Sequence, residues 1–254
     1  MKPHILTEWQ KRKTQGRKSL AVLIDPDHQK LRHLELIIDL SIRSNVDYFF
    51  LGGSLIFQDR LEESIKLIRE NSRIPVVLFP GSGFQISLNA DALLFLSLIS
   101  GRNPEYLIGK QVEASARLHA SSLEVIPTGY MLIDGKSNNT AAYISQTQPI
   151  PYDKPEIAQA TALAGQFLGL KTIFMDAGSG ARQTVPLDMV TKLSRVLEVP
   201  LVIGGGIRDG ENAYQILRAG ADVIVVGNAI EEDPSLIRSL SHAVQEAVSL
   251  TAKK

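Results

Sequence analysis

Three glycine-rich segments of the chain could bind a phosphate group. They cover residues 176–181, 204–208 and 227–229, and each directly follows a short apolar run. Glycine allows backbone N–H groups to approach phosphate oxygens, because no side chain stands between them. Tight turns could explain one such segment, but they explain two neighbouring segments poorly. The last two segments therefore predict a phosphate site, and they leave open which reaction it serves.

Asp176 stands at the end of the apolar run that leads into the first of these segments. A carboxylate at this point could accept a proton from a hydroxyl group of a bound phosphate ester, which makes Asp176 the candidate general base. The alternative is that Asp176 only caps the turn that follows it. The sequence is compatible with both roles.

A second pair of polar residues could bind a divalent cation. Asp25 ends one apolar run, and Ser54 follows the next run after two glycines. One carboxylate and one hydroxyl suit a hard cation such as Mg²⁺, which keeps waters and takes further ligands from substrate phosphates. The alternatives are structural, since Asp25 could shape the turn before Pro26 and Ser54 could cap a short helical turn. An isolated Asp-Pro-Asp sequence is more often structural.

Short apolar runs recur through the chain and predict the strands that carry these residues. Most runs are followed by a glycine or a turn and then by apolar residues at helical spacing. Such runs are typical of strands in a parallel sheet that helices cover on its outer face. The predicted strands are residues 20–24, 48–51, 76–79, 92–98, 130–133, 172–175, 201–203 and 223–226. The predicted helices are residues 59–70, 104–120, 155–168, 186–197, 210–219 and 234–250.

Eight repeats of strand and helix in 254 residues favour a single-domain, closed (β/α)8 barrel of the TIM type over residues 1–254. An open doubly wound sheet stays possible, but no Gly-x-Gly-x-x-Gly motif follows the first strand. In a barrel the carboxyl ends of the strands form the catalytic rim, and phosphate is most often bound after the seventh and eighth strands. The glycine segments, Asp25 and Asp176 are therefore expected on that rim.

Two connections depart from the repeat. Residues 81–91, between the third and fourth strands, leave little room for an outer helix. They predict either a trimmed loop or an apolar cleft in the outer wall where a helix is missing. Residues 137–153 are rich in Ser, Asn, Thr, Gln and Pro, and they could form a lid after the fifth strand.

The composition of the chain excludes several classes of protein. The 27 basic and 27 acidic residues cancel, so no net positive field attracts nucleic acid or an anionic membrane. The absence of cysteine excludes disulfides and thiol nucleophiles and fits a reducing cytoplasm. The N-terminus lacks the apolar core of a signal peptide, and the longest apolar stretch is too short to span a bilayer. We therefore expect a cytoplasmic protein without membrane insertion.

Taken together, the motifs resemble the geranylgeranylglyceryl phosphate synthase family, which includes the heptaprenylglyceryl phosphate synthases. The resemblance runs nearly end to end and depends on an ordered set of motifs. These are residues 25–27, 52–54, 80–82, 103–106, 127–130, 174–180, 204–208 and 227–228. The Ala-Gly-Ser-Gly sequence at residues 177–180 is similar to the second, archaeal-type group of the family.

The resemblance implies a function and a set of site residues. Such enzymes join the 3-hydroxyl of sn-glycerol 1-phosphate to C1 of a long prenyl diphosphate, here most simply geranylgeranyl diphosphate, and release diphosphate. By resemblance, Asp25 and Ser54 bind Mg²⁺. The residues implied to hold glycerol phosphate are Phe174, Met175, Asp176, Ala177, Gly178, Ser179, Gly180, Gly205, Gly206, Gly227 and Asn228. A barrel without its third outer helix and a homo-oligomer are implied in the same way.

Residues 174–176 depart from the family pattern, and two of these changes, at 174 and 176, alter polar groups. Where relatives commonly have Tyr-Leu-Glu, this chain has Phe174, Met175 and Asp176, so a phenol is lost and the acid is one methylene shorter. The base then has to sit closer to its substrate, and a hydrogen bond to the glycerol phosphate is expected to be missing. Two other functions stay open: a barrel isomerase or aldolase that acts on a sugar phosphate, and a non-catalytic barrel that binds ligands.

Overall fold

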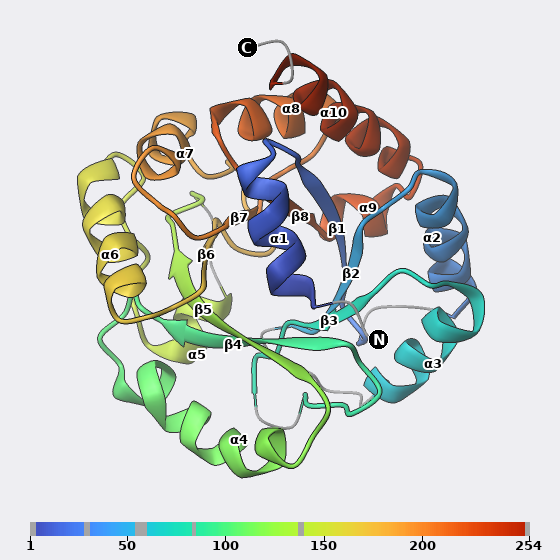
Figure 1. Ribbon diagram of the computed structural model, residues 1–254, viewed down its shortest axis with the longest axis horizontal. Helices are drawn as coiled ribbons and strands as arrows, with labels where there is room; N and C mark the ends of the chain where they lie inside the picture. Colours follow the sequence, from blue (N-terminus) through green and yellow to red (C-terminus); the bar gives the residue numbers. More distant parts are fainter. Residues whose placement is uncertain (1–3, 28–30, 54–59, 83–84, 137–139, 252–254) are drawn as a thin grey trace.

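The apolar runs of the chain form the strands of a closed parallel barrel (Figure 1). The computed structural model describes residues 4–27, 31–53, 60–82, 85–136 and 140–251. Each strand pairs with the next along the chain, and β8 closes the barrel by pairing with β1. The strands are β1 (Ser19–Ile24), β2 (Tyr48–Leu51), β3 (Val76–Leu78), β4 (Ala92–Leu98), β5 (Glu124–Leu132), β6 (Thr172–Asp176), β7 (Leu201–Gly204) and β8 (Val223–Val226). The predicted TIM-type fold is therefore confirmed.

A ring of helices covers the outer face of the strands (Figure 1). The outer helices are α2 (Leu31–Arg43), α3 (Leu61–Asn71), α4 (Lys110–His119), α6 (Pro155–Phe167), α7 (Leu187–Ser194), α8 (Gly210–Ala219) and α10 (Leu236–Thr251). A π-helical turn, η1 (Glu105–Gly109), precedes α4, and the short helices α5 (Thr140–Ser145) and α9 (Asn228–Glu232) lie in connections after β5 and β8. Pro155 occupies the first turn of α6, where its missing N–H is not needed. Among the described residues, none of the helices has the length and apolar character that a membrane span requires.

The strands contribute to two separate cores, because successive side chains of a strand point to opposite faces. In β6, Phe174 packs inside the barrel with Val202, whereas Met175 packs outside it with Ile203. Since both faces are buried, the strands need continuous apolar runs rather than an alternating pattern. Asp176 follows on the same face as Phe174 and ends β6 at the rim of the barrel.

Helix α1 (Ile5–Thr14) lies across the amino ends of the strands and was not predicted from the sequence (Figure 1). Its Trp9 is only 1% exposed, and the Trp9 ring centroid lies 5.7 Å from that of Tyr48. The Glu124 carboxylate accepts hydrogen bonds from the first two N–H groups of α1, at 2.6 and 3.0 Å, where the helix has no internal acceptors. The helix therefore closes the end of the barrel opposite the predicted rim.

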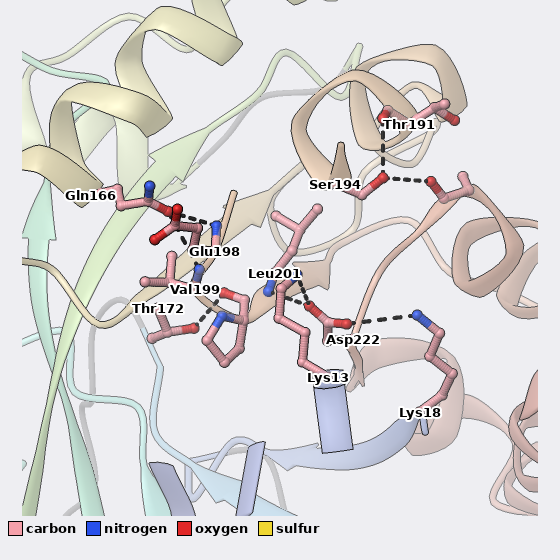
Figure 2. A network of polar contacts seen from close by, with 12 residues as sticks. Lys13, Lys18, Gln166, Thr172, Thr191, Ser194, Glu198, Val199, Leu201 and Asp222 are labelled. Atoms are coloured by element: carbon pink, nitrogen blue, oxygen red, sulfur yellow. Dashed lines mark hydrogen bonds and ion pairs between the residues drawn. The ribbon is translucent and has the colours of Figure 1, made fainter. Parts of the chain in front are cut away.

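Charged side chains hold α1 against the barrel. The Nζ atoms of Lys13 and Lys18 lie 3.0 and 3.6 Å from the carboxylate of Asp222, which is shown between them in Figure 2. Burial lowers the pKa of Lys18, and the charge of Asp222 acts in the opposite direction. Asp222 also accepts the N–H of Leu201, at 2.9 Å, so the same carboxylate connects α1 to β7.

The two connections that depart from the strand and helix repeat were predicted with different success. Between β3 and β4, residues 79–82 and 85–91 form no helix, so the predicted absence of the third outer helix is confirmed for these described residues. Residues 140–153, which were expected to be irregular, contain α5 and a parallel bridge between Ile133 and Ile150. The remaining part of the predicted lid, residues 137–139, lies outside the described residues.

Candidate active site

A cavity of about 800 Å³ opens at the carboxyl ends of the strands. Its polar part is lined by Asp25, Asp176 and the three glycine segments. Its apolar part extends past β4 to α4, on the side where the third outer helix is missing, and is lined there by side chains that include Ile86, Ala114 and Leu118. One continuous cavity can therefore accept a ligand with a charged head and an apolar body.

Asp176 is held by two hydrogen bonds at the polar end of this cavity. Its Oδ1 accepts the N–H of Gly178 at 2.7 Å, and its Oδ2 accepts the hydroxyl of Tyr130 at 2.6 Å. Burial raises the pKa of Asp176, whereas the hydrogen bonds from Tyr130 and Gly178 act to lower it. The contact with Gly178 shows that Asp176 caps the turn, as one alternative above had it. This does not exclude the role of a base, because each carboxylate oxygen has a second lone pair that can accept a substrate proton.

Tyr130 is a site residue that sequence reasoning did not assign. It lies on β5 opposite Phe174 of β6, and the two residues project into the barrel from neighbouring strands. Burial and the charge of Asp176 raise the pKa of Tyr130 well above its usual value, so the phenol stays protonated and donates to the carboxylate. The chain lacks the tyrosine that the family pattern has at position 174. The hydroxyl of Tyr130 nevertheless donates a hydrogen bond to Asp176, the shorter acid of this chain.

Three aromatic rings pack together next to Asp176. The ring centroids of Phe79 and Phe174 are 5.1 Å apart in a stacked arrangement. Tyr130 packs with its ring edge-on against both, at 5.7 Å from Phe79 and 5.6 Å from Phe174. All three side chains line the cavity, and together they fix the orientation of the phenol.

The glycine segments come together as a cradle beside the carboxylate. Gly205 and Gly206 have positive φ values of 79° and 71°, which favour glycine. A Cβ atom on Gly205 would lie 2.6 Å from both Asp176 Oδ1 and the Gly178 nitrogen. The Ser179 hydroxyl donates to Asn228 Oδ1 at 3.0 Å, which connects the first segment to the third. Backbone groups from three strand ends therefore surround one small space.

The predicted glycerol phosphate residues do not all line the cavity. Those that line it are Phe174, Asp176, Gly178, Ser179, Gly180, Gly205, Gly206, Gly227 and Asn228. Met175 and Ala177 are instead buried in the core between the strands and the helices. The cavity is also lined by Arg208, whose Nη2 donates to Ala181 O at 3.0 Å and which sequence reasoning did not assign.

Asp25 ends up at the rim, as expected, and it also makes a turn contact. Its Oδ1 accepts the N–H of Asp27 at 3.0 Å, and its own N–H donates to Glu231 Oε1 at 3.3 Å. The Oδ2 atom of Asp25 lies so close to Gly53 that a Cβ at position 53 would be only 2.9 Å from it. A larger residue at position 53 would therefore clash with the carboxylate. Ser54, the other predicted metal ligand, lies outside the described residues. No group of three or more His, Cys, Asp or Glu side chains suited to a metal occurs in the part of the chain that the structure describes.

The segment that replaces the third outer helix supports the loop beside Asp25. The Gln85 side chain donates from Nε2 to Gly53 O at 2.9 Å, and its Oε1 accepts the N–H groups of Gly81 at 3.0 Å and Gly53 at 3.4 Å. Gln85 is buried, and it connects the ends of β2 and β3. The described part of this segment is therefore more than a trimmed loop, because Gln85 positions the backbone at the rim.

Comparisons with known proteins identify relatives of this chain. The model of the PcrB family matches residues 9–247. A geranylgeranylglyceryl phosphate synthase of Chitinophaga pinensis is 51% identical over 236 residues, covering 93% of this chain and 94% of the relative. One of Pyrococcus furiosus is 42% identical over 216 residues, covering 85% of each chain.

A solved structure shows the same arrangement of the whole chain. The (S)-3-O-geranylgeranylglyceryl phosphate synthase of Thermoplasma acidophilum, in complex with its substrate sn-glycerol-1-phosphate, superposes with a TM-score of 0.90 at 30% identity. The match covers 96% of this chain and 99% of that one. The resemblance inferred from the motifs is confirmed. This chain belongs to the PcrB family, together with the geranylgeranylglyceryl phosphate synthases that it matches.

Proposed function

We propose that this protein is a geranylgeranylglyceryl phosphate synthase, which forms an ether between the 3-hydroxyl of sn-glycerol 1-phosphate and C1 of geranylgeranyl diphosphate. The observation that carries the proposal is the place of Asp176. Its carboxylate lies between a glycine cradle suited to phosphate and an apolar cavity suited to a prenyl chain. The relative from Thermoplasma acidophilum was solved with sn-glycerol-1-phosphate, which supports the assignment of the cradle.

The glycerol phosphate is held by its phosphate group in this proposal. Gly205, Gly206 and Asn228 line the cradle, and in this proposal their backbone N–H groups donate to the phosphate oxygens. The guanidinium of Arg208 adds a positive charge to the cavity. With the phosphate fixed, the 3-hydroxyl of glycerol can reach the Asp176 carboxylate.

The prenyl chain occupies the apolar part of the cavity. Each methylene that leaves water contributes about 0.8 kcal/mol, so a long chain needs a continuous apolar wall. The side chains of β4, α4 and Ile86 provide such a wall where the third outer helix is missing. A sugar phosphate isomerase or aldolase has no use for a cavity of this kind.

The donor set at the rim fits Mg²⁺. Asp25 lines the cavity, and Gly53 allows the backbone after β2 to come close to this carboxylate, since a Cβ there would lie 2.9 Å from Oδ2. A hard cation that takes most of its ligands from water and from phosphate needs no larger cluster of protein ligands. We therefore propose that Asp25 and Ser54 hold the ion. When bound, Mg²⁺ supplies positive charge that stabilises the departing diphosphate.

The residues of this chain then orient the reaction and accept the proton. The bond between C1 and the diphosphate oxygen breaks, and the glycerol O3 forms the new bond to C1. Asp176 accepts the proton of the 3-hydroxyl as this bond forms. The hydroxyl of Tyr130 and the N–H of Gly178 keep the carboxylate in place, because each donates to one of its oxygens.

The proposed function is tested with the purified protein, labelled geranylgeranyl diphosphate, sn-glycerol 1-phosphate and Mg²⁺. We expect a labelled lipid that keeps its label after phosphatase treatment and resists mild base, as an ether does. A reaction without glycerol phosphate and one with EDTA are the controls. Release of free geranylgeraniol without any ether would contradict the proposed transferase activity. Formation of the ether at full rate in EDTA would contradict the proposed role of Mg²⁺.

We further propose that the enzyme is a cytoplasmic homo-oligomer. Large apolar side chains that are exposed in the single chain support self-association, among them Ile108, Val112 and Tyr143 at 60, 64 and 85% exposure. Burial of such side chains against a second copy removes apolar surface from water. Light scattering on the purified protein gives the mass in solution, and the mass of one chain would exclude the oligomer.

A further inference from the structure

The π-helical turn η1 lies where the chain passes from β4 into α4, at the wall of the apolar cavity. The N–H of Lys110 donates to the carbonyl of Glu105, five residues earlier, instead of to the fourth residue back as in an α-helix. Tyr106, within this turn, lines the cavity, as does Lys110 directly after it. A π turn is rarer than the α-helical turn that could replace it, so other contacts must hold it in place.

Gln111 provides the main contact of this kind. Its side chain is only 8% exposed, and its Nε2 donates both to Leu96 O on β4 and to Tyr106 O in the turn, the latter at 3.2 Å. Both N–H bonds of the amide are therefore used to connect the strand to the turn. Its Oε1 is buried and has no hydrogen-bond partner among the described residues, which carries a cost in free energy.

A second side chain supports the same connection. The hydroxyl of Ser97, the next residue on β4, donates to Leu107 O at 2.8 Å. The Leu96 carbonyl is therefore connected to the Tyr106 carbonyl through the Gln111 amide, and Ser97 contacts the next carbonyl, that of Leu107, directly. Without these contacts the π turn can tighten into an α-helical turn, which contains one residue fewer. The residues before the turn then rotate about the helix axis by about 100°, the angle that one residue spans in an α-helix. Such a rotation moves Tyr106 out of the cavity wall.

We propose that Gln111 is a positioning residue for the prenyl chain. Its amide fixes η1 against β4 and thereby keeps Tyr106 in the wall of the apolar cavity. This inference rests on the proposed function, because it assigns the prenyl chain to that cavity. It predicts an effect on the prenyl part of the substrate and none on the diphosphate or on glycerol phosphate, since these groups bind at the strand ends.

The test uses Gln111→Met, which keeps the length of the side chain and removes both donors. Binding of geranylgeranyl thiodiphosphate, an unreactive analogue, is measured by calorimetry and should weaken about tenfold, or about 1.4 kcal/mol. Inhibition by inorganic diphosphate and the KM for sn-glycerol 1-phosphate should stay within about twofold. Equal weakening of inorganic diphosphate and of the prenyl analogue, or unchanged binding of both, would overturn the inference.

Gln166→Met is the matched control. Gln166 is also a glutamine that supports main-chain groups, since its Oε1 accepts the N–H groups of Glu198 at 2.8 Å and Val199 at 3.4 Å, but it does so at the amino ends of the strands (Figure 2). This variant should lower the melting temperature and leave all three binding constants unchanged. A loss of prenyl affinity equal to that of Gln111→Met would show a general effect on stability and overturn the inference.

Ser97→Ala keeps the inference testable if Gln111→Met does not fold. It removes the second contact with the turn, so prenyl affinity should fall in the same direction and by a smaller factor. In that case, unchanged prenyl affinity in a folded Ser97→Ala protein would overturn the positioning role. The proposed function fails separately, when the wild-type protein itself forms no ether.

Discussion

At the residue scale, the proposed chemistry depends on the carboxylate of Asp176 and on the groups that hold it. Asp176 is one methylene shorter than the acid that relatives commonly have. Gly205 allows the backbone after β7 to pass close to Oδ1 of Asp176, since a Cβ there would lie 2.6 Å from that oxygen, and Tyr130 donates to Oδ2 from the neighbouring strand. Each oxygen of the shorter acid therefore accepts one hydrogen bond, from Gly178 and from Tyr130.

We predict that Asp176→Asn lowers kcat by about 10² to 10⁴ and changes the KM for sn-glycerol 1-phosphate by much less. Asparagine keeps the size and one acceptor oxygen, but it cannot take the proton. Steady-state kinetics with Asp188→Asn, an exposed aspartate in the first turn of α7, provide the control. If Asp176→Asn turns over normally but binds glycerol phosphate weakly, Asp176 is a positioning residue and not the base.

The pH dependence of turnover should respond to Tyr130. Because burial raises the pKa of Asp176, the base becomes active only as the pH rises above the usual range for aspartate. The Tyr130 hydroxyl stabilises the charged carboxylate and thus lowers this pKa, so Tyr130→Phe should move the acidic limb of the kcat profile to higher pH.

The substrate phosphate titrates equally for both enzymes, so the difference between their profiles reports on the protein. Tyr214→Phe, on α8 and away from the cavity lining, should leave the limb in place. If the acidic limb of the kcat profile of Tyr130→Phe stays in place or moves to lower pH, the Tyr130 hydroxyl does not lower the pKa of the base.

At the scale of elements, the sequence predicts the strands well where burial alone decides them. The strand β5 is the exception, because it begins at Glu124 and includes Pro127 and Gly129, which rarely occur inside strands. Pro127 is tolerated because only its carbonyl is used, as the acceptor of the Lys171 N–H at 2.8 Å. The contact of Tyr130 with Asp176 could not be predicted from the sequence either. It joins residues 46 positions apart, which only the pairing of β5 with β6 brings together.

Helix α1 gives a prediction at this scale. Glu124 accepts the first two N–H groups of α1, and its charge lies at the positive end of the helix. Glu124→Ala should therefore lower the free energy of unfolding by about 1 to 2 kcal/mol, with kcat and both KM values unchanged. Thermal unfolding measures the loss, at about 2 to 4 °C per kcal/mol for a chain of this size. Glu35→Ala, on the exposed face of α2, is the control, and a loss of the same size in both variants would exclude a specific role for Glu124.

At the scale of the whole molecule, the barrel brings residues from distant parts of the chain to one rim. The closed order of the strands places the ends of β6, β7 and β8 side by side, which forms the cradle from three separate segments. The short segment between β3 and β4 leaves the apolar part of the cavity open beside it. The glycine pattern predicted the cradle, whereas the short segment left a trimmed loop and an apolar cleft as alternatives. The pattern alone could not decide between these two, because that depends on how side chains such as Phe79 and Tyr106 line the space.

The most direct measurement compares the two enantiomers of glycerol phosphate with geranylgeranyl diphosphate and Mg²⁺ at saturation. A fixed cradle and a fixed carboxylate allow only one hand to present its 3-hydroxyl to Asp176 while its phosphate stays bound. We predict that kcat/KM for sn-glycerol 1-phosphate exceeds that for sn-glycerol 3-phosphate by roughly 100-fold or more, since a displacement of about 1 Å can cost that much in rate. Equal values for the two enantiomers would contradict a site in which the phosphate cradle and the base are fixed relative to each other.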